Sequence, residues 1–402
     1  MSSPFLAAVW GGAPVPESLD QLASLPLIDK AMLRVDQAAH PPFGSYLAFE
    51  AVARLHRTSG TTGQAMNIAL STADTHVTAV VGGRAQSAAG LGAGHRVVHC
   101  LNYQLWMGGL TDHMTLEQTG ATVIPFGVGN SRLLVETILE VGATAISCTP
   151  SYPSVLERVI AQDFPSLAPA DLGLQLGLFG GEPGLDDPEF RGRLERTWGF
   201  QARNANYGVS DVFCNFASQC HLDTDLHFCA ADVLWAELID PDTTELVALA
   251  PGASGELVLT HLERDCQPLV RFRSGDVVLV TATDPCGCGR TGFRFRVIGR
   301  SDDMVVVRGL NVFPTAIAAV INAVPGLSGE YRIVLPGPPP YHRLPVEVEA
   351  APGVAVGAEL VQRVEEAIHT GVRVTAQVRV VPFGTLPRTE GKTRRVIRED
   401  LS

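Results

Sequence analysis

The amino-acid sequence predicts an α/β protein with a large N-terminal domain and a small C-terminal α+β domain. Helix-like and strand-like segments alternate over the first half of the chain, which is typical of βαβ units around a largely parallel sheet. A section of short strand-like runs follows it. The 402 residues exceed one ordinary domain, and the pattern changes again after residue 300. We therefore predict two domains, 1–300 and 301–402.

The alternating section predicts the βαβ part of the N-terminal domain. Apolar residues at helical spacing predict helices over 75–89, 133–141, 155–162 and 188–198. Short apolar runs between them predict strands over 96–101, 120–126, 143–147 and 174–179. Residues 1–55 mix short apolar runs with proline, which indicates short helices and loops.

The remaining strands predict a β-rich subdomain and then the C-terminal domain. Short runs between turns predict an antiparallel or barrel-like section with strands over 234–239, 256–260, 277–280 and 294–298. In the C-terminal domain, two helices are expected over 315–324 and 359–369, among strands such as 331–335 and 346–349.

Composition excludes several classes of function. The net charge is −12 and no basic patch precedes the tail at 388–398, so we expect no nucleic-acid partner. No apolar stretch is long enough for a membrane span, and no secretory signal stands at the start, so we expect a cytoplasmic protein without a membrane partner. The eight cysteines then indicate metal ligands and buried thiols rather than disulfides.

A loop of small hydroxyl residues and glycines runs from Thr58 to Gln64. Glycines let the backbone approach a phosphate, and hydroxyl and amide groups donate hydrogen bonds to its oxygens. The spacing is not that of a Walker loop. A phosphate-binding loop and a plain turn are equally compatible with this segment alone.

Three further motifs are each weak in isolation. Asp276 follows a glycine turn, where a carboxylate can accept hydrogen bonds from a ribose diol, although a simple turn between strands is the better explanation of this segment alone. The polar segment 298–309 suits a hinge or a linker. Lys392 stands on a glycine-bearing basic segment, which is either a phosphate-binding or carboxylate-binding point charge or a solvated tail.

The order of these motifs is more specific than any one of them. With Gly-Gly-Glu-Pro at 180–183 and Tyr-Gly-Val-Ser-Asp at 207–211, the series resembles the acyl-adenylate-forming superfamily. The segments 120–125, 148–152 and 309–314 resemble its phenylacetate–coenzyme A ligase branch. The resemblance covers nearly the whole chain and implies a mobile C-terminal lid domain on an adenylation core.

The resemblance also implies roles for individual residues. ATP would be bound by Thr58, Ser59, Gly60, Thr61, Thr62, Gly63, Gly181, Glu182, Pro183, Tyr207, Gly208, Asp276 and Arg300. Lys392 would act in catalysis with Arg300, Asp302 would be the hinge, Asp211 the Mg²⁺ ligand, and Gly309 would line the thiol channel. Two positions depart from the family: Gln64 replaces a common lysine and Asp211 a common glutamate.

The acid pocket is the least determined part of the site. The resemblance places Tyr103, Trp106, Gly108, Gly180 and Asn206 in it, and the two aromatic residues suit an aromatic acid. The neighbouring Asn102 and Gln104 indicate either a polar substituent on the acid or a solvated surface.

Four residues predict a structural zinc site. Some members of this branch bind zinc through a Cys, a His and a CxC pair, and Cys220, His227, Cys286 and Cys288 match. Four nitrogen and sulfur ligands form a closed tetrahedral site. His221, His261 and Cys266 are alternative ligands, and four unrelated residues are the alternative interpretation.

The resemblance implies an ATP- and Mg²⁺-dependent ligase that adenylates a small, aromatic carboxylic acid and transfers the acyl group to coenzyme A. Loading of an acyl-carrier protein is an alternative, and so is a non-catalytic nucleotide-binding homologue. Retention of Lys392, Asp276 and Asp302 together argues against the latter. A homodimer is one expected assembly.

Overall fold

The chain divides into two compact units. The computed structural model describes residues 3–47, 51–58, 65–308, 310–337, 340–387 and 395–399. The larger unit comprises residues 1–274 and 279–296, and the smaller one 275–278 and 297–402. Among the described residues, no helix combines the length and the apolar character that crossing a bilayer requires.

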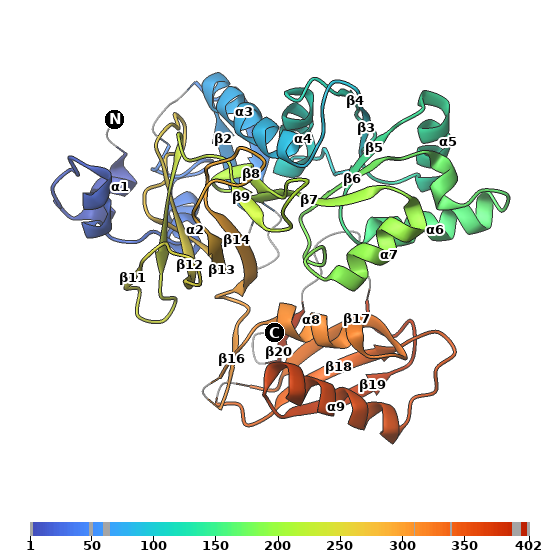
Figure 1. The fold of residues 1–402 in the computed structure, drawn as a ribbon. Coiled ribbons are helices and arrows are strands. Elements are labelled where there is room, and N and C mark those ends of the chain that lie inside the picture. Colours follow the sequence, from blue (N-terminus) through green and yellow to red (C-terminus); the bar gives the residue numbers. More distant parts are fainter. Residues whose placement is uncertain are drawn as a thin grey trace. The chain divides into compact units, whose positions relative to one another are not determined.

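The larger unit contains most of the elements in Figure 1. Its helices are α1 Pro4–Trp10, η1 Leu19–Ser24, α2 Lys30–Ala39, α3 Thr72–Ala88, α4 Met107–Glu117, α5 Ser131–Val141, α6 Tyr152–Asp163, η2 Pro169–Leu172 and α7 Pro188–Trp198. Its strands are β1 Arg54–Arg57, β2 Asn67–Leu70, β3 Arg96–His99, β4 Thr122–Ile124, β5 Ala145–Cys148, β6 Leu176–Gly180, β7 Gln201–Val209, β8 Phe213–Ser218, β9 Leu226–Phe228, β10 Leu234–Ile239, β11 Leu246–Val247 and β12 Ser254–His261, followed by β13 Phe272–Ala282 and β14 Arg294–Arg300, which pass between the units.

One twelve-stranded sheet joins the two predicted parts of the N-terminal domain. Its order is β11-β10-β12-β13-β14-β9-β8-β7-β6-β5-β3-β4. Strands β4, β3, β5, β6 and β7 are parallel neighbours, whereas β7 pairs with β8 in the antiparallel sense. The predicted α/β class is therefore confirmed, and the β-rich section is antiparallel and continues the parallel sheet through β7.

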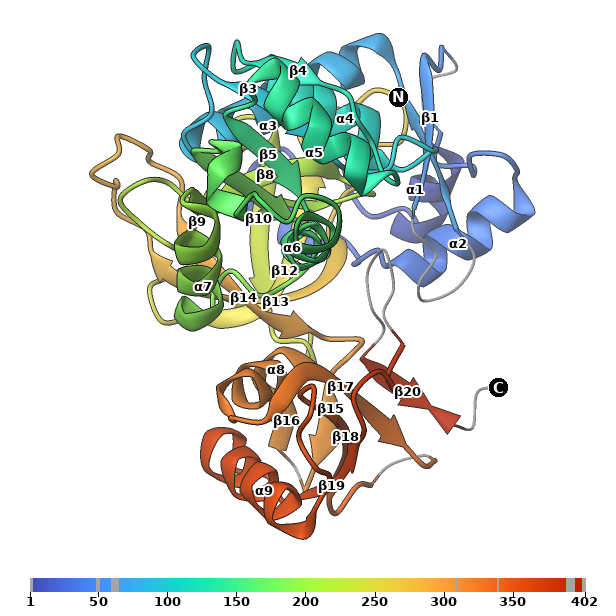
Figure 2. The same cartoon turned by 90° about the vertical axis from the view of Figure 1, so that its right-hand side faces the viewer.

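Helices cover both faces of the parallel strands. Helices α5, α6 and α7 pack on one face through a core that includes Leu134, Leu156 and Leu194. Helices α3 and α4 cover the other face, where Leu116 of α4 and Leu178 of β6 belong to one buried core. Figures 1 and 2 show these two helical layers. Functional side chains must therefore lie at an edge of the sheet, because both faces are buried.

Local sequence explains where individual elements begin and end. Helix α7 has the predicted bounds: the carboxylate of Asp187 accepts from two backbone amides at its start, Pro188 takes the first position, and Gly199 ends it with φ +75°. Strand β4 is shorter than the predicted 120–126. Pro125 has no N–H to donate to the ladder, which explains the early end.

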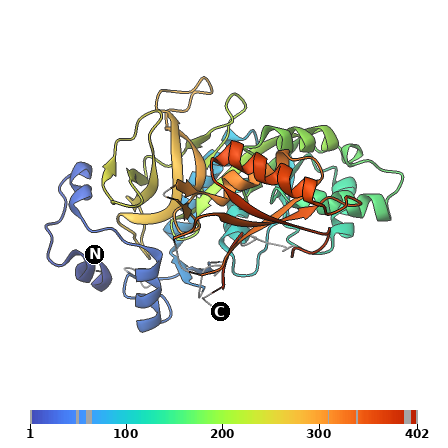
Figure 3. The ribbon, with the colours of Figure 1, turned by 90° about the horizontal axis from the view of Figure 1, so that it is seen from below.

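The smaller unit is an α+β domain with its own core. It contains β15 Val305–Val307, β16 Leu310–Val312, α8 Pro314–Ala323, β17 Leu327–Leu335, β18 Leu344–Ala350, α9 Ala358–Val372, β19 Ala376–Val381 and β20 Val396–Arg398. The sheet order is β19-β18-β17-β20. Ile317 of α8 and Val364 of α9 are buried against it, and Figure 3 shows α9 in red across the strands.

Candidate active site

The residues that sequence analysis assigned to the acid pocket gather where parallel strands end. Trp106 follows β3, Gly180 ends β6, and Asn206 lies near the end of β7. Carboxyl ends of neighbouring parallel strands meet at one edge of a sheet, which is where ligands bind in open α/β folds. The topology thus places these residues, which are far apart in sequence, around one region.

Glycines bring the pocket residues into close contact. A Cβ atom on Gly108 would lie 2.9–3.1 Å from ring atoms of Trp106, and one on Gly181 would lie 4.0 Å from the same ring. Gly181 also has φ +81°, which favours glycine. At Gly180 a Cβ atom would clash with Asn206, at 2.5 Å from its Cβ. Trp106 therefore lies against two glycines, and a third lets β6 approach Asn206.

Tyr103 is turned toward helix α4. Its hydroxyl lies 2.9 Å from Nδ1 of His113, whose Nε2 lies 3.3 Å from a carboxylate oxygen of Glu117. Its ring meets that of His99 edge-on at 5.5 Å, and burial raises the pKa of the phenol well above its usual range. The hydroxyl of Tyr103 is thus engaged within the protein, whereas the Trp106 ring lies by the glycines.

The residues expected near adenine lie on the same strand ends. Glu182 accepts a hydrogen bond from the Ser151 amide at 3.3 Å. Tyr207 packs edge-on against Phe216 and Phe295, with centroids 5.2 and 5.3 Å apart. Gly208 allows β7 to approach β8, because a Cβ there would lie 2.0 Å from a carbonyl oxygen. Pro183, Glu182 and Gly181 form the turn that follows β6.

Asp211 is paired with a lysine that sequence analysis did not single out. Lys30 Nζ, at the start of α2, lies 2.6 Å from Asp211 Oδ2. The Asp211 side chain is 5% exposed and that of Lys30 is 32% exposed. No local signal could have revealed this pair, since 181 residues separate its members. One carboxylate together with substrate phosphates is a common ligand set for Mg²⁺. Here the Asp211 carboxylate is engaged by Lys30, and its Mg²⁺ role stays a prediction.

In the smaller unit, the guanidinium of Arg300 bonds both Asp276, the predicted ribose ligand, and Asp302, the predicted hinge residue. Arg300 Nη1 lies 2.7 Å from Asp276 Oδ1, and Nε and Nη2 lie 2.8 and 3.0 Å from the two carboxylate oxygens of Asp302. Burial lowers the pKa of Arg300, but the carboxylates of Asp276 and Asp302 outweigh it and raise that pKa. Gly275, at φ +79°, gives the guanidinium room.

Several predicted residues lie outside the described part of the chain. They are Ser59, Gly60, Thr61, Thr62, Gly63, Gln64, Gly309 and Lys392. Thr58, at the start of the loop, is buried, and its hydroxyl accepts a hydrogen bond from the Met66 amide at 3.0 Å.

The four predicted zinc ligands come together. One ligand atom from each of Cys220, His227, Cys286 and Cys288 lies within 4.8 Å of the others. His227 Nε2 is 3.6 Å from Cys288 Sγ. Burial raises the pKa of Cys288, but hydrogen bonds from Arg290 bring it down to about 7, which favours a thiolate. Two thiols on one turn, a third thiol and an imidazole thus fit a tetrahedral zinc site.

The alternative ligands are not part of this cluster. His261 is buried, lies 3.3 Å from the Val212 carbonyl through Nε2, and accepts from the Leu269 amide at Nδ1. Among the described residues, only the four predicted side chains form a candidate group of metal ligands. His221 and Cys266 lie outside it as well.

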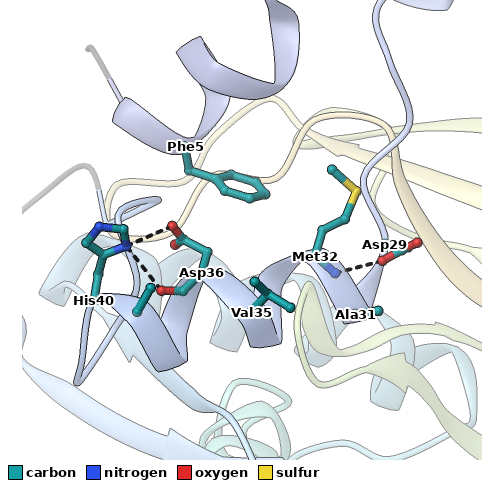
Figure 4. Close-up of a pocket in the computed structure, with 8 residues that line it drawn as sticks. Phe5, Asp29, Ala31, Met32, Val35, Asp36 and His40 are labelled. Carbon is teal, nitrogen blue, oxygen red and sulfur yellow. Dashed lines mark hydrogen bonds and ion pairs between the residues drawn. The ribbon is translucent and has the colours of Figure 1, made fainter.

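A cavity of about 560 Å³ lies between α1 and α2. Figure 4 shows Phe5 of α1 facing the side chains of Met32, Val35 and Asp36 on α2. None of the predicted site residues lines this cavity, so we assign it no part in the reaction.

Comparison with known proteins decides the family. Residues 309–399 match the model of the AMP-binding enzyme C-terminal domain. Phenylacetate-coenzyme A ligase of Thermus thermophilus is 33% identical over 94% of this chain and 87% of that protein. The Escherichia coli phenylacetate-coenzyme A ligase is 30% identical, with 94% and 85% covered. The chain belongs to the phenylacetate–coenzyme A ligase family. It is therefore an AMP-forming acid–coenzyme A ligase.

Solved structures agree with this assignment to the phenylacetate–coenzyme A ligase family. A 2-hydroxyisobutyryl-CoA ligase in the postadenylation state, in complex with 2-HIB-AMP, has a TM-score of 0.86 at 31% identity, with 99% of this chain and 86% of that chain covered. ATP-bound MatB from Rhodopseudomonas palustris, at 17% identity and a TM-score of 0.62, shares the fold. The reaction uses ATP and coenzyme A and passes through an acyl-adenylate.

Proposed function

We propose that this ligase activates a small carboxylic acid with a flat or compact acyl group that packs against Trp106. The observation that supports this is the placement of the Trp106 ring against Gly108 and Gly181 at the carboxyl ends of the parallel strands. An indole face suits an aromatic ring, and glycines leave room beside it. By their names, the relatives act on phenylacetate and 2-hydroxyisobutyrate, which are both small acids.

The proposed ATP-binding roles are those that the family resemblance implies. Thr58 and the loop 59–63 would bind the phosphates, and the turn at 181–183 with Tyr207 and Gly208 would border the adenine. Asp276 would accept hydrogen bonds from the ribose, with Arg300 beside it. Asp211 would hold Mg²⁺, which when bound offsets the charge of the phosphates.

Two half-reactions follow in one site. In the first, the carboxylate oxygen attacks the α-phosphorus of ATP, the bond to the pyrophosphate oxygen breaks, and Lys392 stabilises the developing negative charge. In the second, the coenzyme A thiolate attacks the acyl carbon, and AMP leaves. Asp302 would be the hinge of the C-terminal domain between these steps, and Gly309 would line the path of the thiol. The Cys220, His227, Cys286 and Cys288 cluster would hold a structural zinc.

ATP–pyrophosphate exchange across a panel of small acids tests the proposal. We expect exchange that depends on one class of acid, and acyl–coenzyme A when coenzyme A is added. If the acyl group is transferred to a carrier protein and not to coenzyme A, the acceptor is the carrier protein. No exchange with any aromatic or compact acid would contradict the acid class. A homodimer and a cytoplasmic location stay predictions.

A further inference from the structure

A buried carboxylate stands behind the acid-pocket candidate Asn206. Asp112 lies on α4 and is 2% exposed. Its Oδ2 accepts a hydrogen bond from Nδ2 of Asn206 at 2.5 Å. Its Oδ1 is buried, and apart from the weakly donating thiol of Cys214 it has no hydrogen-bond partner among the described residues. Burying a carboxyl group with so few hydrogen bonds costs stability. Packing alone therefore does not explain this residue.

The carboxyl group of Asp112 on α4 meets residues of two strands, β7 and β8. Asn206 approaches from β7, and the thiol of Cys214 on β8 lies within hydrogen-bond distance. Burial raises the pKa of Asp112 to about 7, although hydrogen bonds from Cys214 and Asn206 oppose the rise. Cys214 is itself buried, so it offers no route to solvent. The partly exposed side chain in this group is that of Asn206.

Asn206 connects this group to the acid pocket. It lies directly against Gly180, since a Cβ atom on that glycine would come within 2.5 Å of the Asn206 Cβ and backbone carbonyl oxygen. The next residue, Gly181, faces the Trp106 ring. A bound acyl group that contacts Trp106 would therefore lie near Asn206, and Asp112 would lie behind it.

The carboxylate fixes which way the Asn206 amide is turned. A carboxyl oxygen that carries no proton only accepts hydrogen bonds, so Oδ2 of Asp112 selects the NH₂ group of the asparagine. Because the side-chain amide of Asn206 is planar, its oxygen Oδ1 then points away from Asp112. The hydrogen bond to Asp112 is the one that the Asn206 side chain makes among the described residues, so Oδ1 can accept a hydrogen bond from a bound molecule. A carbonyl acceptor at the pocket favours a ligand that carries an N–H or O–H donor.

We propose that Asp112 is a positioning residue for acid specificity. It orients the side-chain amide of Asn206, whose oxygen Oδ1 then selects acids with an amino or hydroxyl substituent. The inference rests on the proposed function, because it places the acyl group beside Asn206. A pocket built to bond a donor rejects the analogue that lacks it, since its polar group is then buried unpaired. Unsubstituted acids of the same shape are therefore poor substrates.

Matched pairs of acids test this inference. The pairs are benzoate with its amino and hydroxy derivatives, phenylacetate with its amino and hydroxy derivatives, and isobutyrate with 2-hydroxyisobutyrate. The measurement is kcat/KM for acid-dependent pyrophosphate exchange. In at least one pair we expect the donor-bearing acid to be favoured by roughly 10-fold or more. The amino and hydroxy arms distinguish the two donors.

Variants separate positioning from a merely structural role. Asp112→Ala should bring the ratio within the favoured pair toward one, by slowing the donor-bearing acid most. Asp112→Asn, whose amide oxygen can still accept from Asn206, should retain much of the preference. If Asp112→Ala does not fold, Asn206→Ala should reduce the ratio in its place, since its side chain is partly exposed.

The outcomes are distinguishable. A wild-type enzyme that favours the donor-bearing acid in none of the pairs overturns the inference while leaving the ligase assignment intact. The inference is also overturned if the ratio of kcat/KM within the favoured pair of acids is unchanged in a folded Asp112→Ala or Asn206→Ala variant. Absence of exchange with every acid in the panel instead contradicts the proposed acid class on which the inference rests.

Discussion

At the scale of single residues, Arg300 couples two carboxylates with different proposed roles. Its guanidinium bonds Asp276 and Asp302 at 2.7–3.0 Å. Asp276 is 8% exposed, so a ribose that bonds it would meet a carboxylate already oriented by Arg300. Orientation before binding reduces the entropy lost when the ligand binds.

Replacing Asp276 tests the ribose assignment. We expect Asp276→Ala to weaken ATP binding by about 1.5–3 kcal/mol, or roughly 10- to 150-fold, because a charged acceptor is lost. Isothermal titration calorimetry measures this directly. Asp232→Ala, which removes a carboxylate from an exposed pair with Arg84, is the matched control and should bind ATP normally. Unchanged ATP affinity in Asp276→Ala would remove Asp276 from the nucleotide site.

The Lys30–Asp211 pair makes a second prediction at this scale. Lys30→Met leaves the Asp211 carboxylate, 5% exposed, without its ammonium partner. We expect Lys30→Met to lower the free energy of unfolding, and the double variant with Asp211→Asn to recover part of that loss. The coupling free energy between the two residues should then be about 1–2 kcal/mol. Urea denaturation of the wild type, both single variants and the double variant measures it. Additive single effects would show that the pair contributes nothing to folding.

At the scale of elements, the metal cluster joins segments that are distant in sequence. Cys220 follows β8, His227 lies on β9, and the two remaining cysteines lie on the turn between β13 and β14. A metal held there would cross-link these strands in the folded state only. Its binding free energy would then add to folding stability.

We predict about one zinc ion per chain at this cluster. Cys286→Ser should lose the zinc and lower the melting temperature more than it changes the preference among acids. Cys229→Ser is the control, because its thiol donates to the His227 carbonyl at 3.3 Å but is not one of the four ligands. Elemental analysis of protein purified without chelator checks the stoichiometry. Little zinc with full stability would exclude a structural metal.

Elements with strong local signals were predictable from the sequence. The bounds of α7 follow from Asp187, Pro188 and Gly199. The CxC pair stood out because two cysteines between Pro285 and Gly289 suit a metal turn better than a core. Contacts between distant segments were not predictable. No local signal marks Asp112 on α4 as a buried residue, and only the packing of that helix against the sheet brings it to Asn206.

At the scale of the whole molecule, buried histidines predict the response to acid. Burial lowers the pKa of His56 and His99 to about 4 and that of His261 to about 3. An unfolded histidine titrates near 6.5, so below about pH 6.5 the unfolded chain binds more protons than the folded one. Stability should therefore be greatest above that pH and fall as the pH drops toward 4.

Replacing one of these histidines checks the argument. We expect His99→Gln to make the loss of stability between pH 6.5 and 4 less steep, by roughly 1.4 kcal/mol per pH unit at most. Chemical denaturation at a series of pH values measures the slope, and His40→Gln, an exposed position, serves as the control. An identical slope in His99→Gln and wild type would mean that His99 does not contribute.

The central claim is that one chain carries out adenylation and then transfer to coenzyme A, and that Lys392 acts in the first step alone. The most direct test follows both half-reactions in Lys392→Ala under single-turnover conditions. We predict that this variant makes almost no acyl-adenylate from acid and ATP, yet converts supplied acyl-adenylate and coenzyme A into thioester at nearly the wild-type rate. Equal loss of both half-reactions in a folded variant, or ADP in place of AMP from the wild type, would contradict the account.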